Sequence, residues 1–337
     1  MSEFLHAVIV EILGKAAADS VLSTVSLPET TSRGNSATTL SRGALATVLC
    51  LLLLQKLLNE VPEAARYVSF IARQGRKLVL DHGALRTVRA DWLGSLPSGQ
   101  TLFTRILEPL GYTCVGLYPL DALRMTGRAY AHQDDPPEIP QFFVSEIHPE
   151  QFSKATQDAA QSVFEESRDP LDDHAKAALA HLAREGAISC EVAIRLLPCL
   201  AACFDRHHPQ PALTDYDVLL AESVEFAWIA TEGNRFNHAT DRVSDVKALA
   251  LELRAQQFPM KETIEVSATG LVRQTAIKAA QVERPFRGPE GQIAKRLVPG
   301  SFFEFISRGR LEHGGYDLRF DTSNAQGIFK MTAASRE

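Results

Sequence analysis

The spacing of hydrophobic residues predicts helices near the start of the chain. Leu5, Val8 and Ile12 recur at intervals that place them on one side of a helix. The predicted helices cover 1–26, 42–60 and 64–73, and a polar loop rich in Ser and Thr covers 28–41. We therefore expect the N-terminal part of the chain, residues 1–76, to be helical.

Two later blocks have the composition and alternation of β-strands. The predicted strands cover 77–88, 112–117 and 141–147 in the first block, and 237–243, 262–268, 271–279 and 301–307 in the second. Gly83 is predicted to break the first strand, and alanine-rich runs between the blocks predict helices. The predicted division is N-terminal helices at 1–76, a first β module at 77–148, a helical insert at 149–230 and a second β module at 231–337. We expect these parts to form one integrated domain.

The two β modules repeat a pattern of residues in the same order and at similar offsets. The matching segments are Asp81-His82-Gly-Ala-Leu-Arg-Thr-Val88 with Asn237-His238-Ala-Thr-Asp-Arg-Val243, and Gln141-Phe-Phe-Val-Ser145 with Ser301-Phe-Phe-Glu-Phe305. A duplicated module with an insert between its copies explains this pattern. In the alignment each copy has a histidine near a strand start, but only the second carries a carboxylate, Glu304, where the first has Val144.

Composition and charge narrow the class of protein. The chain of 337 residues is 45% hydrophobic and 23% charged, which is typical of a folded globular protein and excludes disordered and fibrous classes. Its 35 Lys and Arg against 41 Asp and Glu give a net charge of -6 without a long basic run, so we expect no nucleic-acid partner.

The cysteines and the apolar runs predict where the protein resides. Five cysteines, an odd number in a chain large enough to bury its own core, argue against a disulfide scaffold and favour a reducing compartment. The N-terminus lacks the pattern of a signal peptide. The most apolar run, residues 44–54, is shorter than the roughly 20 residues needed to cross a bilayer. We therefore expect a cytoplasmic protein without a membrane partner.

Glu304 stands among large apolar residues in its predicted strand. Phe302, Glu304 and Ile306 share one face of that strand because side chains alternate. A carboxylate in such surroundings is costly to bury without a cation. A metal ion supplies one, and an arginine such as Arg273 or Arg308 is the alternative.

The duplication places Glu304 together with His82 and His238. Two imidazoles and one carboxylate, with coordination positions left open, are how non-haem Fe(II) oxygenases hold their metal. The same residue types suit Mn, Co and Zn, so they do not select the metal. Histidines that are simply hydrogen-bonded in the core are the alternative to ligation.

Arg86 follows His82 by four residues. On an extended segment this spacing puts the two side chains on one face, at most about 13 Å apart along the strand. A planar guanidinium near a metal suits bidentate binding of a substrate carboxylate, whereas a structural salt bridge is the alternative.

A second set of metal-ligand residue types lies in the helical insert. Cys199, Cys203, His207 and His208 have spacing that places the first three on one helical face. The segment is rich in Leu and Ala, so we expect the cysteines to be core residues. The sequence contains no Gly-x-Ser-x-Gly elbow, Walker motif or dinucleotide fingerprint, which argues against a kinase, a common serine hydrolase or a Rossmann dehydrogenase.

Four segments resemble the 2-oxoadipate dioxygenase/decarboxylase family, a glyoxalase-like group. They are Asp-His-Gly-Ala-Leu-Arg-Thr-Val at 81–88, Asn-His-Ala-Thr-Asp-Arg-Val at 237–243, Leu-Val-Arg-Gln-Thr at 271–275 and Phe-Phe-Glu-Phe-Ile-Ser-Arg-Gly at 302–309. The resemblance implies an α+β fold related to the vicinal-oxygen-chelate group. In that fold, paired β modules form a curved, barrel-like sheet around a metal, here with a helical N-terminus and a helical insert.

The resemblance also implies chemistry and site residues. Metal ligands are implied at His82, His238 and Glu304, and a substrate-holding, catalytic role is implied for Arg86. The implied cofactor is Fe(II), with Zn or Ni as other possible occupants. The implied reaction converts 2-oxoadipate and O2 into 2-hydroxyglutarate and CO2 in lysine breakdown.

Other interpretations stay open on the residues alone. A glyoxalase-type isomerase or lyase would keep the fold and use Zn or Ni without consuming O2. A binding protein would use the metal pocket to capture a small carboxylate without turnover. Asp81 and Asn237, each next to a histidine, are candidates for orienting the ligands.

Overall fold

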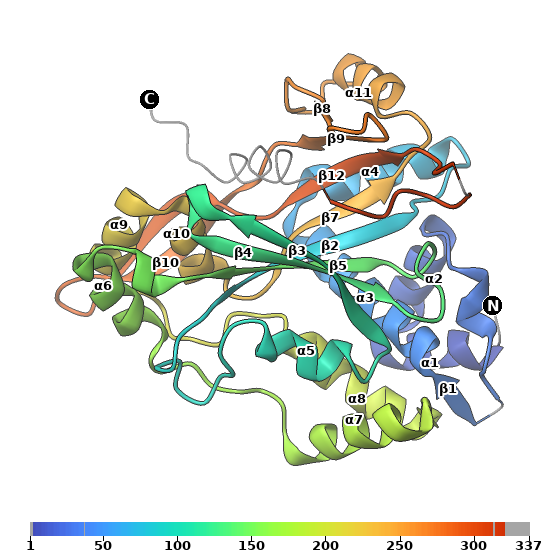
Figure 1. The fold of residues 1–337 in the computed structure, drawn as a ribbon, viewed down its shortest axis with the longest axis horizontal. Coiled ribbons are helices and arrows are strands. Elements are labelled where there is room, and N and C mark those ends of the chain that lie inside the picture. The colour runs from blue at the N-terminus through green and yellow to red at the C-terminus, as the bar shows by residue number, and fades with distance from the viewer. Residues whose placement is uncertain (1–2, 37, 313, 321–337) are drawn as a thin grey trace.

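The computed structural model describes residues 3–36, 38–312 and 314–320 (Figure 1). The α-helices are α1 (Glu3–Leu13), α2 (Lys15–Thr24), α3 (Arg42–Glu60), α4 (Pro62–Arg73), α5 (Thr101–Leu107), α6 (Lys154–Phe164), α7 (Asp173–Glu185), α8 (Cys190–Ala202), α9 (Leu213–Glu222), α10 (Val224–Glu232) and α11 (Val246–Ala255). Short 3-10 helices are η1 (Glu29–Ser32), η2 (Asp121–Leu123) and η3 (Pro149–Gln151). The helical N-terminus and the helices between the two β blocks agree with the sequence-based expectation.

Within the described ranges, the strands form one large sheet and two small ones. They are β1 (Thr39–Ser41), β2 (Leu80–Val88), β3 (Tyr112–Leu120), β4 (Met125–His132), β5 (Gln141–Ile147), β6 (Ala187–Ser189), β7 (Phe236–Arg242), β8 (Glu265–Val266), β9 (Val272–Ile277), β10 (Gln281–Arg287), β11 (Ile293–Pro299) and β12 (Phe302–Arg308). The large sheet has the order β3-β4-β5-β2-β7-β12-β9-β8, and β1-β6 and β10-β11 are antiparallel pairs. The predicted α+β class with a curved, barrel-like sheet is confirmed.

The large sheet is symmetric about its two central strands. β2 pairs antiparallel with β7, β2 pairs parallel with β5, and β7 pairs parallel with β12. Each histidine-bearing strand therefore has the same kind of neighbour on its outer side. This arrangement is what a duplicated module predicts, with β5 equivalent to β12.

The register corrects one detail of the alignment between the two modules. Glu304 lies opposite Thr240, two residues beyond His238. The residue opposite Ala84, two residues beyond His82, is Phe143. The structural counterpart of Glu304 is therefore Phe143 and not Val144.

Gly83 does not break its strand. β2 continues through Gly83, and every residue of β2 is buried. A Cβ atom at Gly83 would lie 2.2 Å from Cζ of Phe236 on β7. The glycine is thus explained by the close approach of a neighbouring ring rather than by a turn.

Helices α3 and α4 cover the face of the sheet opposite the candidate site. α3 packs on β7 and α4 on β12, where Tyr67 of α4 contacts the rings of Phe303 and Phe305. α3 is long and apolar enough to cross a membrane, but 72% of its apolar window is buried inside the protein. It is the central helix of the largest hydrophobic cluster.

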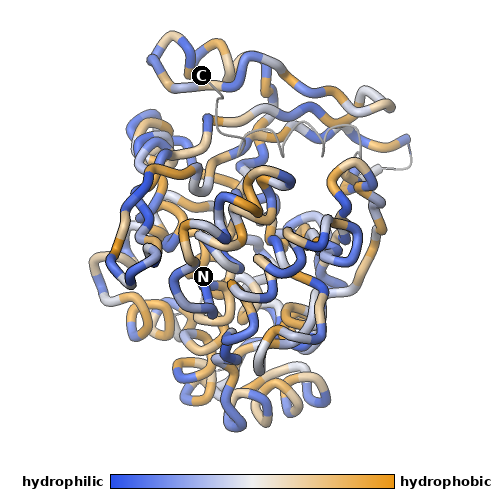
Figure 2. Tube along the Cα trace, turned by 90° about the vertical axis from the view of Figure 1, so that its left-hand side faces the viewer, coloured by the Kyte–Doolittle hydropathy of each residue, from blue (hydrophilic) through white to orange (hydrophobic). Residues whose placement is uncertain are grey.

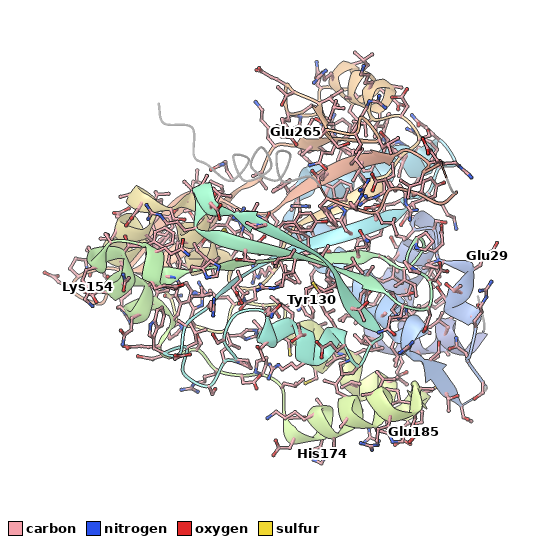
Figure 3. All side chains as sticks on the ribbon, viewed as in Figure 1. Glu29, Tyr130, Lys154, His174, Glu185 and Glu265 are labelled. Carbon is pink, nitrogen blue, oxygen red and sulfur yellow. The ribbon has the colours of Figure 1, made fainter. Side chains whose placement is uncertain are left out.

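Helices α6, α9 and α10 pack together and lie apart from the pair α7 and α8. α6, α9 and α10 lie on the left in Figure 1 with β10, whereas α7 and α8 lie at the bottom. Figure 3 labels His174 and Glu185 near the two ends of α7, away from Tyr130 of β4 in the sheet. Figure 2 shows hydrophobic and hydrophilic stretches alternating along the chain, as expected for helices with one buried side.

Candidate metal centre

Three neighbouring strands bring His82, His238 and Glu304 together. β2, β7 and β12 are adjacent in the sheet and supply one residue each. One ligand atom from each residue lies within 4.8 Å of the others, and all three residues are buried. Among the residues that the structure describes, this is the one group of three or more His, Cys, Asp or Glu side chains with such spacing.

Both imidazoles direct Nε2 toward the carboxylate of Glu304. The distance to Oε2 of Glu304 is 3.5 Å from Nε2 of His82 and 3.3 Å from Nε2 of His238. The opposite ring nitrogens contact the preceding residues, with Nδ1 of His82 2.8 Å from Asp81 and Nδ1 of His238 3.2 Å from Asn237. If each Nδ1–H donates to its neighbour, each Nε2 is free to bind a metal. This donor set fits a divalent metal.

The electrostatics of the three residues are coupled. Burial alone would raise the pKa of Glu304, but the adjacent His238 and His82 outweigh it and lower that pKa to about 2. Burial lowers the pKa of His238, and Glu304 opposes this only in part. For His82 the hydrogen bonds with Asp81 and Glu304 outweigh burial and raise the pKa. Glu304 is therefore ionised at neutral pH, as a metal ligand must be.

Arg308 does not neutralise Glu304. Its Nε and Nη2 atoms donate to the carboxylate of Asp81 at 2.9 and 2.8 Å. Asp81 is buried, and Arg308 and His82 together hold its pKa far below the usual range despite the opposing effect of burial. Arg308 thus neutralises Asp81, the hydrogen-bond partner of His82, and does not neutralise the Glu304 carboxylate.

Thr240 is part of the centre and was not singled out from the sequence. Its hydroxyl donates to Oε2 of Glu304 at 3.0 Å and lies 3.1 Å from Nε2 of His82. Thr240 is fully buried and lies directly opposite Glu304 in the sheet. The signal in the sequence is its position two residues beyond His238, which puts both side chains on the same face of β7.

Arg86 lies on the same face of β2 as His82. Its side chain is buried, and its guanidinium carbon is 5.0 Å from the ring centroid of Trp228 on α10. Burial lowers the pKa of Arg86 to about 10, while the nearby Glu225 opposes that shift. Asn234 donates to the Arg86 carbonyl at 2.9 Å. The helical insert thus supplies Trp228 and Glu225 beside this arginine.

The second candidate set in the sequence does not assemble into a metal site. Cys203 contacts the Cys199 carbonyl, and His207 contacts the Cys203 carbonyl at 3.1 Å. His208 is directed elsewhere, with Nε2 2.9 Å from the Ala230 carbonyl. The side chains bind backbone groups and do not converge.

Comparisons with known proteins agree with this geometry. Residues 51–331 match the family described as 2-oxoadipate dioxygenase/decarboxylase. A 2-oxoadipate dioxygenase/decarboxylase from Pseudomonas putida KT2440 is 27% identical over 268 residues, which cover 74% of this chain and 54% of that protein. The chain thus spans about half the length of this curated relative.

Two solved structures share the fold over most of the chain. A glyoxalase superfamily protein from Ralstonia eutropha JMP134 is 45% identical with a TM-score of 0.92, and the match covers 95% of this chain and 99% of that one. Hydroxyglutarate synthase from Oryza sativa, solved with 2-oxoadipate, is 18% identical with a TM-score of 0.70, covering 93% of this chain and 96% of that one. The second likeness concerns the fold alone.

Proposed function

The chain belongs to the 2-oxoadipate dioxygenase/decarboxylase family, and we propose that it is an Fe(II)-dependent dioxygenase and decarboxylase of a 2-oxo acid. The proposed substrate is 2-oxoadipate, and the proposed products are 2-hydroxyglutarate and CO2. Both atoms of O2 remain in the products, one in the new carboxylate and one in the hydroxyl group. The observation that carries the proposal is the buried His82, His238 and Glu304 set on the same face of the sheet as Arg86.

His82, His238 and Glu304 would hold the metal. When bound, Fe(II) supplies coordination of the 2-oxo acid and activation of O2, which amino-acid side chains do not provide. Asp81 and Asn237 keep the imidazoles oriented by engaging their Nδ1 atoms. The ionised state of Glu304 at neutral pH supports its role as the anionic ligand.

Arg86 would bind the substrate carboxylate that is remote from the metal. Its guanidinium presents two parallel N–H donors to a carboxylate, which fixes orientation as well as position. The ring of Trp228 on α10 lies 5.0 Å from the guanidinium carbon, within the range of a cation–π contact. Holding the substrate at both ends would place a single carbon toward the reacting oxygen, which is catalysis by positioning.

Substitution of one ligand and of the arginine separates these roles. We expect Glu304→Gln to lose stoichiometric Fe(II) binding together with activity. Arg86→Gln is expected to keep one iron per chain and to raise KM for 2-oxoadipate by about a hundredfold, as expected for a lost charged hydrogen-bond pair. Iron analysis and steady-state kinetics measure both, with Leu311→Ala on the exposed surface as control. Full activity in Glu304→Gln would contradict the proposed centre.

A glyoxalase-type isomerase or lyase is the second candidate. It is favoured by the 45% identity to a glyoxalase superfamily protein. Such an enzyme would act with Zn or Ni and without O2. Turnover of a 2-oxo acid under strict anaerobiosis would support it and contradict the dioxygenase.

A further inference from the structure

The face of the sheet beside the candidate centre carries a small apolar cluster. Its buried members are Ala84, Ala129 and Phe143, and Tyr118 and Phe320 pack against them. None of these five side chains carries a charge. We call them the apolar wall.

Phe320 connects the apolar wall to the candidate metal ligands. Its ring stands edge-on to His82 with centroids 4.8 Å apart, and its centroid is 4.9 Å from that of Phe143. Its backbone N–H donates to the Tyr118 hydroxyl at 3.1 Å. A residue far along the chain is thus held against the ring of a proposed metal ligand.

Arg308 anchors the segment that carries Phe320. Its Nη1 atom donates to the carbonyls of Asp317 and Arg319 at 2.7 and 3.2 Å. Its remaining nitrogens bind Asp81, which orients His82. The guanidinium carbon also lies 5.4 Å from the Phe320 ring centroid, within the range of a cation–π contact. The ring position is therefore coupled to the same groups that orient a proposed ligand.

The register places the wall between the candidate centre and Arg86. Ala84 lies midway between His82 and Arg86 on one face of β2, and Phe143 lies opposite Ala84 on β5. A substrate bound to the metal at one end and to Arg86 at the other must run past this part of the face. The part of the substrate between its two carboxylates meets apolar carbon there.

We propose that Phe320, supported by Phe143, packs against the methylene spacer of a 2-oxo dicarboxylic acid and determines which spacer length the enzyme accepts. This inference rests on the proposed function. Phe320 thus sets specificity, because its ring contacts the substrate and takes no part in the bonds that form or break. Removal of the ring leaves space that a longer spacer fills.

The test compares three homologous acids, 2-oxoglutarate, 2-oxoadipate and 2-oxopimelate. In Phe320→Ala we expect the ratio of kcat/KM for 2-oxopimelate to that for 2-oxoadipate to rise about tenfold, the lower end of what one methylene decides in an apolar pocket. Phe320→Leu, the more conservative change, is expected to shift the ratio in the same direction by less. Leu318→Ala, in the same segment but without a ring, is expected to leave the ratio unchanged.

A binding measurement provides a readout that does not depend on turnover. Calorimetric titration of the Zn(II)-loaded variants with each acid is expected to show the same change in the ratio of dissociation constants. An equal loss for all three acids in both Phe320 variants would overturn the proposal, since it would indicate a structural role only. If the wild-type protein neither binds nor turns over any of the acids, the proposed function fails and this inference fails with it. If the wild-type protein is active and the Phe320 variants keep its ratio of kcat/KM values, the proposal for Phe320 fails and the proposed function stands.

Discussion

The hydroxyl of Thr240 lies between two of the proposed metal ligands. It donates to Glu304 and lies 3.1 Å from Nε2 of His82. Thr240→Val removes that hydroxyl with little change in shape, so the Glu304 carboxylate loses the bond that fixes its orientation. We expect affinity for Zn(II) or Fe(II) to fall at least about tenfold, the usual effect of losing a group that orients a ligand. Competition with a chelating dye measures the dissociation constant.

Thr240→Ser is the matched control for this prediction. It keeps the hydroxyl and loses only a methyl group, so metal affinity close to that of the wild type is expected. Equal weakening in both variants would show that packing at this position matters and that the hydrogen bond does not.

The residues of the centre differ in how far the sequence identified them. His82, His238 and Glu304 came from the repeated pattern and the family resemblance, because both record residue identity directly. Thr240 and Phe320 depend on strand register and on a contact between distant segments, which no local pattern encodes. Their roles became visible only when β7, β12 and the segment after β12 were placed together.

Gly83 shows how a single position determines the packing of two strands. A methyl group at this position would overlap the Phe236 ring, which precedes Asn237 and His238 on β7. We expect Gly83→Ala to lower the free energy of unfolding by about 1–3 kcal/mol, the usual cost of overpacking a core. Urea denaturation measures the loss.

A second substitution tests whether the ring is the cause. Phe236→Leu should cost less in the Gly83→Ala background than in the wild type, because the smaller side chain makes room for the methyl group. Strictly additive losses would contradict the proposed overlap.

His208 couples α10 to the segment after α8. Burial lowers the pKa of His208 to about 3, and its Nε2 lies 2.9 Å from the Ala230 carbonyl. The unfolded chain binds this proton near the ordinary value of 6.5, so between the two values the unfolded state holds more protons. Stability from this group is therefore present above about pH 6.5 and is lost as the pH falls toward 3, by about 2 kcal/mol at pH 5.

Urea titrations at pH 7.5 and pH 5 test this prediction. Between pH 7.5 and pH 5, we expect the free energy of unfolding to fall by about 2 kcal/mol less in His208→Gln than in the wild type. The other buried histidines stay in both proteins, so the comparison isolates this one. An identical fall in the free energy of unfolding of the two proteins would contradict the lowered pKa of His208.

The sequence predicted elements with strong periodicity better than those without it. The helix expected over 42–60 and the strand expected over 141–147 have the observed bounds. β4, β10 and β11 were not expected, since β4 contains glycine and polar residues and the β10–β11 hairpin is largely exposed and charged. Pairing with neighbouring strands stabilises them, which single-strand patterns do not show. The polar stretch 28–41 likewise contains η1 and β1 rather than loop alone.

The symmetry of the whole sheet explains why the candidate centre occurs once among the residues that the structure describes. The two modules meet at β2 and β7, so their histidines lie diagonally across the central pair with ring centroids 5.6 Å apart. Only the second module adds a carboxylate, because Phe143 occupies the equivalent place in the first. One copy thus completes the ligand set, and the other contributes to the apolar wall.

Oxygen consumption measures the proposed dioxygenase reaction itself. The measurement adds 2-oxoadipate to protein loaded anaerobically with one Fe(II) per chain, then follows O2, CO2 and the product acid together. We expect equal molar amounts of O2 consumed and of CO2 and 2-hydroxyglutarate formed, and no uptake in Glu304→Gln. Absence of O2 uptake by protein that holds one iron and binds 2-oxoadipate would contradict the proposed reaction.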